Sequence, residues 1–588
     1  MNSESTIPTP ATPDVCTFAL LIDGKEIPGE FQVLSVSVNR ELNRIPTAVV
    51  QLQDGDPAKA TFAASNTDYF LPGKKIDIQF GYRSKNQSVF KGLVIKQNIK
   101  IRKSSSVLSV ECRDEAVKMT GSRKSRYFTD KNDSDIMEEL IGFHGLQKEV
   151  EATTPSLKEV VQYDATDWDF LLCRAEANGQ VVMVEDGKVK IAKPVVSGAP
   201  VVKVAYGSTV LELDAEMDAR WQSKAIKANS WNASDQAIIN ADAAEPATTN
   251  SGNLSPADLA DVLGGDTLEI RHGGKLDTAE LQAWADARLL KERLAKIRGR
   301  VKFQGFAGIM PGNIIDITGV GARLGGKMYV SGVRQIMSGG NWETDVQFGL
   351  STELFAETYN FRPLPAAGLL PAVSGLQIGI VTVLENDPDG EDRIKVRLPL
   401  INTTEEGIWA RIATLDAGKG RGTFFRPEID DEVVIGFLNE DPRYPIVLGM
   451  CHSSAKPAPE PAKDDNHHKG YVSREKLKLT FDDEKKIIAM ETPAGNKLLL
   501  SEDAKGITLE DQNGNKITLD DKGIKIESIK DMTLKAAKDI KIEGANVTIE
   551  AQTAFKAVGT SSAEVSGAST TIKGSGTTTI KGGTVLIN

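Results

Sequence analysis

The C-terminal part of the chain repeats one short pattern, and this pattern decides its fold. Residues 506–550 read GITLEDQNGNKITLDDKGIKIESIKDMTLKAAKDIKIEGANVTIE. Apolar pairs separated by one residue recur in this stretch, and from Ile517 to Val547 they start 7 or 8 residues apart. A short strand cannot bury such a pair alone, whereas stacked turns can point all the pairs inward. We therefore predict a β-helix over residues 477–588.

The predicted β-helix is slender. Ser, Thr, Gly and Ala dominate residues 559–579, so the body narrows toward its end. A core this narrow favours several chains wound together. A single-chain solenoid is the alternative.

The composition is that of a globular protein with several domains. The chain has 588 residues, of which 40% are hydrophobic and 26% charged, and this length suggests about three to five domains. The net charge of −11 argues against nucleic acid as a partner, because phosphate binding needs a basic face. The only compact basic cluster, Arg123 to Arg126, is expected to be a solvated turn.

The sequence shows no export signal of its own. Residues 1–14 lack the basic and apolar regions of a secretory signal peptide, and no apolar run reaches the roughly 18 residues of a membrane span. The cysteines are far apart and fit a protein made in a reducing cytosol. We expect synthesis and assembly in the cytoplasm without a signal peptide.

The rest of the chain reads as strands interrupted by a few helices. Short strands such as Phe18 to Ile22 alternate with turns, and helices are expected at 133–142, at 167–178 and from an Asp277/Thr278 cap to about Ile297. Residues 233–266, rich in Ala, Asn, Asp and Ser, are expected to be a loop-rich insertion. Residues 376–450 suit a small Greek-key barrel of five strands.

These observations divide the chain into six parts. The predicted parts are a flexible N-terminus (1–16), a β-rich module with helical insertions (17–361), a linker (362–375), a small barrel (376–451), a second linker (452–476) and the β-helix (477–588).

Several motifs in this order resemble one family. Residues 407–449 read GIWARIATLDAGKGRGTFFRPEIDDEVVIGFLNEDPRYPIVLG, which is similar to the OB-fold signature of VgrG-type spikes of type VI secretion and related contractile injection systems. Asp430 stands where that signature has Gly. The DWDFLL stretch from Asp167 resembles a hub element of the family, and Leu71-Pro-Gly-Lys and Met310-Pro-Gly-Asn resemble its paired barrel turns.

The resemblance implies a mainly β fold and a mechanical role. It implies a phage-tail-hub-like module of two β-barrels with helical insertions, an OB-fold and an intertwined trimeric β-helix needle. Such a homotrimer joins an Hcp-like inner tube and baseplate components to the puncturing tip and pierces the target envelope, carrying effector cargo and touching the target membrane only transiently. It is made in the bacterial cytoplasm and leaves as part of the machine.

The same resemblance places one partner site at the end of the needle. The last strand edges there need a cover, and in this family a PAAR-repeat tip protein supplies it. The residues assigned to this docking site are Thr584, Val585, Leu586, Ile587 and Asn588.

No catalytic, cofactor or metal site is predicted, and the protein is not expected to be an enzyme. The 451–476 stretch is too short for a lysozyme-like domain, which needs two carboxylates flanking a cleft. The histidines lack metal-site spacing. The acidic clusters 385–389 and 430–432 are expected to be exposed turns, and Trp168 and Phe170 are expected to belong to the core.

Two other functions stay open at this point. A tailspike-like surface-binding adhesin would need exposed aromatic ladders, yet residues 477–588 contain only Phe481 and Phe555. A spike with peptidoglycan-degrading activity is the second. The sequence leaves open whether the machine is anchored or a free particle, and whether residues 233–266 contact a partner.

Overall fold

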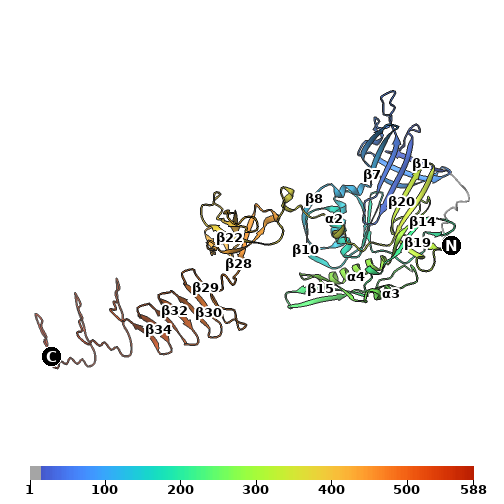
Figure 1. Cartoon of the computed structure of the whole chain (residues 1–588). Helices are drawn as coiled ribbons and strands as arrows, with labels where there is room; N and C mark the ends of the chain where they lie inside the picture. The colour runs from blue at the N-terminus through green and yellow to red at the C-terminus, as the bar shows by residue number, and fades with distance from the viewer. Residues whose placement is uncertain (1–14, 250, 588) are drawn as a thin grey trace. The chain divides into compact units, whose positions relative to one another are not determined.

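The structure is a computed structural model that describes residues 15–249 and 251–587 (Figure 1). Strands dominate it, and the mainly β fold class is confirmed. The chain divides into two compact units, one holding the N-terminal module and the small barrel and the other the C-terminal segment. No helix in the described residues is long and apolar enough to span a bilayer. The domain boundaries themselves stay predictions.

The N-terminal module is built on one sheet of 13 strands. β1 begins at Cys16, inside the predicted flexible segment 1–16, of which residues 1–14 lie outside the described part. The first half of the sheet contains β1 (Cys16–Ile22), β2 (Lys25–Glu26), β3 (Val33–Glu41), β4 (Thr47–Gln53), β5 (Lys75–Tyr82), β6 (Lys85–Arg102) and β7 (Ser105–Arg113). The second half contains β13 (Val202–Ala205), β14 (Val210–Met217), β18 (Ile297–Gln304), β19 (Ile314–Thr318), β20 (Gly326–Ser338) and β21 (Asn341–Phe348).

The two halves repeat one arrangement of strands. In the first half the neighbours run β3-β4-β7-β6-β5-β1, and in the second they run β14-β18-β21-β20-β19-β13. The two predicted Pro-Gly turns occupy equivalent places. Gly73 donates its N–H to the Val94 carbonyl at 2.8 Å, and Gly312 donates to the Val330 carbonyl at the same distance. The two expected barrels are therefore the two halves of one continuous sheet.

The halves agree even in their irregularities. The β6–β7 pairing shifts register after Val94, and the β20–β21 pairing shifts after the equivalent Val330. The β3–β4 pairing shifts after Val33, and the β14–β18 pairing shifts after Val210. A β-bulge is a local departure from regular pairing, so its recurrence at matching positions identifies a true internal repeat.

The halves are joined through β20 and β3, which pair antiparallel from Gly332 opposite Glu41 to Ser338 opposite Ser35. Each half has its own core. The first core, around Phe80 and Phe90, also takes in Met337 and Trp342 from the second half. The second core lies around Phe303 and Phe348.

Two insertions interrupt the repeat, one after β7 and one after β14. The first contains β8 (Arg123–Asn132), α1 (Asp133–Gly142), β9 (Gln147–Val150), β10 (Ser156–Thr166), α2 (Asp167–Ala177), β11 (Val181–Glu185) and β12 (Lys188–Ala192). The second contains β15 (Ala225–Asn232), β16 (Ala237–Asp242), α3 (Pro256–Ala260), β17 (Thr267–His272) and α4 (Thr278–Leu294). The three predicted helices are confirmed, and Asp277 caps α4 by accepting from the Ala279 N–H at 2.8 Å.

Three predictions in this module were wrong in detail. Residues 233–266 are not merely loop: β16 pairs with β15, and α3 begins with a Ser255/Asp258 capping box. The cluster Arg123 to Arg126 is not a turn but the start of β8, because it pairs with β10. The last predicted helix ends at Leu294, since Ile297 already begins β18.

The small barrel is closed, and its five strands lie where the sequence places them. They are β22 (Gln377–Val383), β23 (Ile394–Arg397), β24 (Ile408–Ile412), β27 (Glu432–Phe437) and β28 (Pro445–Met450), in the order β22-β23-β24-β28-β27. Asp430 adopts φ +68°. That left-handed conformation explains why Gly suits this turn, and Asp is among the residues that tolerate it.

The C-terminal segment starts as an antiparallel sheet of seven strands. They are β29 (His468–Val472), β30 (Lys478–Asp482), β31 (Ile487–Glu491), β32 (Lys497–Ser501), β33 (Gly506–Glu510), β34 (Lys516–Asp520) and β35 (Gly523–Glu527), each paired with the next. β29 lies inside the predicted linker 452–476, because its residues pair with β30. No strand follows β35 in the described residues to 587.

Candidate functional site: the apolar face of the C-terminal sheet

The predicted apolar pairs line up on one side of the C-terminal sheet. Phe481 lies opposite Ile488, and Leu479 lies opposite Met490. The same register continues through each later strand to β35. We call this surface the apolar face; its residues are Leu479, Phe481, Ile488, Met490, Leu498, Leu500, Ile507, Leu509, Ile517, Leu519, Ile524 and Ile526.

The apolar face is not covered within the chain. Ile507 is 40% exposed, Leu509 51% and Ile526 56%, and none of the twelve side chains is buried. Two columns of large apolar side chains over six strands form a contiguous patch, and such patches mark interaction sites. The pattern therefore does place its pairs on one face, and that face needs a partner.

The opposite side of the sheet has a different character. Its central column contains residues such as Thr508 and Thr518. Beside it runs a column of alternating charge, in which each Lys lies opposite a Glu of the next strand: Lys478, Glu491, Lys497, Glu510, Lys516 and Glu527. Lys497 and Glu491 form an ion pair at 2.9 Å. This polar side suits contact with water, so the apolar face is the buried one in an assembly.

The segment after β35 departs from the single-chain expectation. Its apolar pairs, beginning with Met532/Leu534, continue the sequence pattern but form no strand, and residues 532–587 as described make no backbone hydrogen bond. A strand needs a neighbouring strand for its backbone groups, and this chain offers none here. Large side chains such as Ile549 are 66% exposed.

The predicted tip residues lie at the end of this segment. Val585, Leu586 and Ile587 are 47%, 86% and 85% exposed, and Asn588 lies outside the described residues. The structure brings no other predicted residue near them. The assignment of 584–588 as a docking site therefore stays a prediction.

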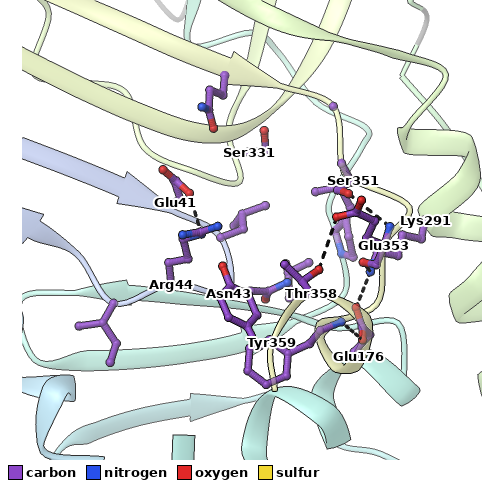
Figure 2. Close-up of a pocket in the computed structure, with 18 of the residues that line it drawn as sticks. Glu41, Asn43, Arg44, Glu176, Lys291, Ser331, Ser351, Glu353, Thr358 and Tyr359 are labelled. Atoms are coloured by element: carbon purple, nitrogen blue, oxygen red, sulfur yellow. Dashed lines mark hydrogen bonds and ion pairs between the residues drawn. The ribbon is translucent and has the colours of Figure 1, made fainter. Parts of the chain in front are cut away.

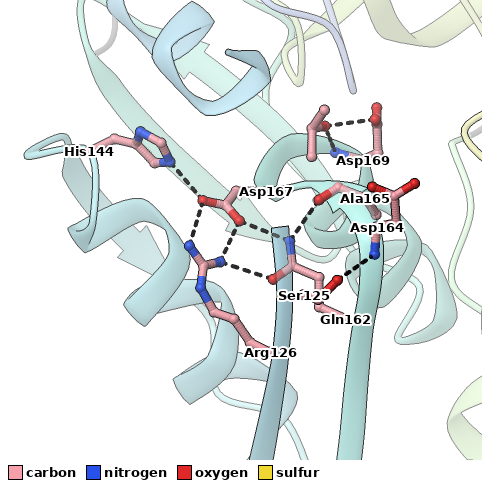
Figure 3. A network of polar contacts seen from close by, with 9 residues as sticks. Ser125, Arg126, His144, Gln162, Asp164, Ala165, Asp167 and Asp169 are labelled. Carbon is pink, nitrogen blue, oxygen red and sulfur yellow. Dashed lines mark hydrogen bonds and ion pairs between the residues drawn. The ribbon is translucent and has the colours of Figure 1, made fainter. Parts of the chain in front are cut away.

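A polar network in the hub explains the DWDFLL motif (Figure 3). Asp167, the first residue of α2, is 2% exposed. Arg126 donates to Asp167 Oδ1 at 2.5 Å, Gln162 Nε2 donates to the same oxygen at 2.9 Å, and His144 Nε2 lies 2.8 Å from Oδ2. Burial raises the pKa of Asp167, but these contacts outweigh burial and hold the pKa below its usual value.

The network has a structural meaning. It ties the start of α2 to β8, β10 and the end of α1, in a core that also contains Trp168. The core assignment of Trp168 is confirmed, since it is 6% exposed. His144 and Gln162 are not adjacent in sequence to Asp167, and no spacing rule could have joined them.

The largest cavity among the described residues lies in the hub and measures about 1150 Å³ (Figure 2). The segment 350–361 forms part of its wall. Lys291 of α4 pairs with Glu176 of α2 and donates to the Glu353 carbonyl, and Glu176 also accepts from the Phe355 N–H at 2.9 Å. Arg44 lies over the Tyr359 ring. These contacts fasten the chain's exit from the hub to both inserted helices.

The acidic cluster around Asp387 is a built turn, not the expected exposed one. Asp387 accepts from the backbone N–H groups of Glu391 and Arg393 at 2.8 and 3.1 Å, and from the Arg393 guanidinium at 2.5 Å. Its carboxylate is therefore fully engaged. Among the described residues no group of three or more His, Cys, Asp or Glu could hold a metal ion.

Comparison with known proteins adds three family models. Residues 12–338, more than half of the chain, match the Alg8 N-terminal domain. Residues 377–452 match the type VI secretion system/phage-baseplate injector OB domain, and residues 487–588 match the phage baseplate V C-terminal trimerisation domain. The type VI secretion system spike proteins VgrG1c and VgrG1b of Pseudomonas aeruginosa strain PAO1 are 28% and 27% identical over 138 and 153 residues.

The chain belongs to the Alg8 N-terminal domain family and to the VgrG spike proteins. The matched stretches cover 22% and 24% of the chain, and they span only about a fifth, 18% and 20%, of those VgrG relatives. Among solved structures, the prophage MuSo2 43 kDa tail protein of Shewanella oneidensis is 13% identical, with a TM-score of 0.44 over 57% of this chain and 98% of that one.

Proposed function

We propose that the chain is the structural spike and hub of a contractile injection machine and works as a homotrimer. The observation that carries this proposal is the apolar face, twelve large side chains aligned in two columns and left uncovered by the chain itself. The match of residues 487–588 to a trimerisation domain supports the same partner, further copies of the chain. Three apolar faces turned toward one axis bury one another.

The proposal extends to the segment after β35. Its apolar pairs continue to the end of the described chain, but its backbone groups are unpaired. Strands from the other two copies would supply both the hydrogen bonds and the cover, as in cross-β assemblies. The result is a stiff rod, which is what a device that transmits force through an envelope requires.

The remaining partners follow from this role. The tip residues Thr584, Val585, Leu586, Ile587 and Asn588 would dock a PAAR-repeat protein. The hub would meet an Hcp-like inner tube and baseplate components, and the spike would carry effector cargo. The machine would assemble in the bacterial cytoplasm, and the spike would be exported or released with it. We infer no catalytic step for the chain, and a zymogram on purified protein tests that part directly.

One pair of variants tests the proposal. Ile507 lies on the apolar face, and its neighbour Thr508 lies on the opposite side of the same strand. We expect wild-type protein and Thr508→Asp to have three times the chain mass of 63.4 kDa by light scattering, and Ile507→Asp to lose the trimer. In the host, Ile507→Asp should also block release of the inner tube.

The contrary results are equally clear. A monomeric wild-type protein would remove the homotrimer. A trimer that tolerates Ile507→Asp but not Thr508→Asp would place the interface on the other side of the sheet.

A further inference from the structure

Two strand edges of the hub lack partners within the chain. β14 is the last strand at its end of the sheet, and it pairs only with β18. The part of β6 after Lys96 pairs with β7 on one side only. Exposed apolar side chains mark both edges: Ile101 is 59% exposed and Leu211 52%. Open edges of this kind are templates for pairing with another chain.

The internal repeat shows what these edges fit. The counterpart of β6 is β20, and the counterpart of β14 is β3. Inside the chain, β20 and β3 pair with each other along seven residues, from Gly332 to Ser338. That contact joins the second half of one chain to its first half. The open edges of β6 and β14 are the same two edges, left over on the other halves.

The bulges fix the correspondence between β6 and β20. Both strands shift register at equivalent valines, Val94 in β6 and Val330 in β20. Counting six residues onward from each valine makes Lys100 the counterpart of Ile336.

The bulges fix the other pair of strands in the same way. β3 shifts register after Val33 and β14 after Val210, so Ser37 corresponds to Asp214. Within the chain Ile336 lies opposite Ser37. The equivalent contact between copies therefore sets Lys100 opposite Asp214.

We infer that β6 of one copy pairs antiparallel with β14 of the next copy, in this register, and that the sheet thereby runs on from copy to copy. The inference rests on the homotrimer proposed above and deepens it by naming the contact. The predicted partners are Lys96 with Asp218, Gln97 with Met217, Asn98 with Glu216, Ile99 with Ala215, Lys100 with Asp214, Ile101 with Leu213 and Arg102 with Glu212.

The side chains supply an independent check, because their chemistry played no part in deriving the register. All three cations on the β6 edge fall opposite anions on β14, and both isoleucines fall opposite apolar residues. Opposite charges and apolar pairs placed directly across strands stabilise a sheet, whereas like charges destabilise it. Lys100 and Arg102 make no ion pair within the described chain, and the Asp214 side chain is 79% exposed.

Core packing points the same way. Met337 of β20 lies in the core of the first half, where it is 4% exposed. Its counterpart Ile101 has no core of its own to enter. Leu213 and Ala215 of β14 pack only partly buried against the second core. Ile101 of one copy would close the second core of the next copy, as Met337 closes the first.

The contact uses two different edges, so it is heterologous and closes into a ring when the rotation allows. Three copies contribute six equivalent halves to such a ring. Within each chain the halves meet through β20 and β3, and between chains they would meet through β6 and β14.

Paired cysteines test the register in the full-length protein. Directly opposed residues have Cα atoms about 4.5–5.5 Å apart, within disulfide range, whereas a partner two residues away lies about 7–8 Å off. We combine Lys100→Cys with Asp214→Cys, and separately Arg102→Cys with Glu212→Cys. The control joins Lys100→Cys to Glu216→Cys. Cys173 and Cys451, which are not buried, are changed to Ser in all variants.

Mild oxidation should give a covalent trimer on a denaturing gel for both matched pairs, at least tenfold more than for the control. Light scattering under reducing conditions shows that each variant still has the native mass. A native trimer in which neither matched pair cross-links, or in which the control cross-links best, overturns the register while leaving the proposed function standing. A monomeric wild-type protein instead overturns the proposed homotrimer, and the inference with it.

Discussion

Asn496 and Gln512 lie in successive turns of the C-terminal sheet, and the Asn496 side-chain oxygen accepts the Gln512 backbone N–H at 3.1 Å. The next turn repeats the arrangement, since Asn515 accepts the Ile529 N–H at 3.1 Å. Each asparagine therefore holds the turn that follows its own. The turns on this side of the sheet are linked by side chains as well as by the strands between them.

We predict that Asn496→Ala loosens this link locally. A hydrogen bond of this kind contributes about 1 kcal/mol, equivalent to about a fivefold change in an equilibrium constant. Hydrogen exchange on the full-length protein should show the Gln512 amide exchanging about fivefold faster. Gln512→Ala is the control, because only its backbone takes part. Equal exchange in Asn496→Ala and wild type would contradict the prediction.

The buried carboxylate of the hub network should matter more. Asp167→Asn removes the charge that Arg126 and His144 face. Removing one partner of a buried ion pair costs about 3 kcal/mol, so the hub should unfold several degrees lower in calorimetry. Glu159→Gln, on the exposed side of β10, is the matched control and should change the midpoint little. Equal midpoints for the two variants would show that the network adds nothing to stability.

The same carboxylate predicts a pH dependence with a definite sign. Its folded pKa lies below the unfolded value of 3.8. Its contribution to the free energy of unfolding is therefore fully present above about pH 3.8 and is lost as the pH falls through the folded pKa. The difference in melting temperature between wild type and Asp167→Asn should shrink between about pH 5 and pH 2. A difference that stays constant over this range would argue against the ion pair.

The repeated turns allow a comparison within one molecule. Gly73 and Gly312 occupy equivalent positions with φ +98° and +89°, where a side chain is strained. A Cβ at Gly312 would lie 2.8 Å from Met183 Sδ, but a Cβ at Gly73 would meet nothing within 4 Å. Both alanine variants should lose about 1 kcal/mol from backbone strain, and Gly312→Ala should lose more. Thermal unfolding of the two variants measures the difference, and an equal loss would mean that Met183 moves aside without cost.

The sequence predicted the parts of the fold that depend on short-range pattern. The period of two placed the barrel strands within a residue or two, and the caps at Asn132 and Asp277 placed helices α1 and α4. The spacing of Ile507 and Leu509 put them on one side of a strand, as the structure confirms. In each case the deciding residues are neighbours in the chain.

The parts that escaped prediction depend on contacts between distant residues. The pairing of β16 with β15 and the burial of Arg126 against Asp167 arise only when the insertions fold back on themselves. The internal repeat is hidden for a similar reason. Its two halves share turns and bulges but few identical side chains, so only the registers reveal it. The seven-strand meander was also missed, since the repeats were read as turns of a helix.

The matching bulges also say something about how the hub arose. Regular strands can come to look alike independently, but a register shift at the same place in two sheets, flanked by the same neighbours, is the mark of a duplicated ancestor. The two copies have since been treated differently. In the first, β3 passes to β4 through a short turn; in the second, the same junction holds five extra elements from β15 to α4. The short turn after Glu41 is therefore a natural place to graft new material, because its twin has already accepted a whole subdomain without losing the frame.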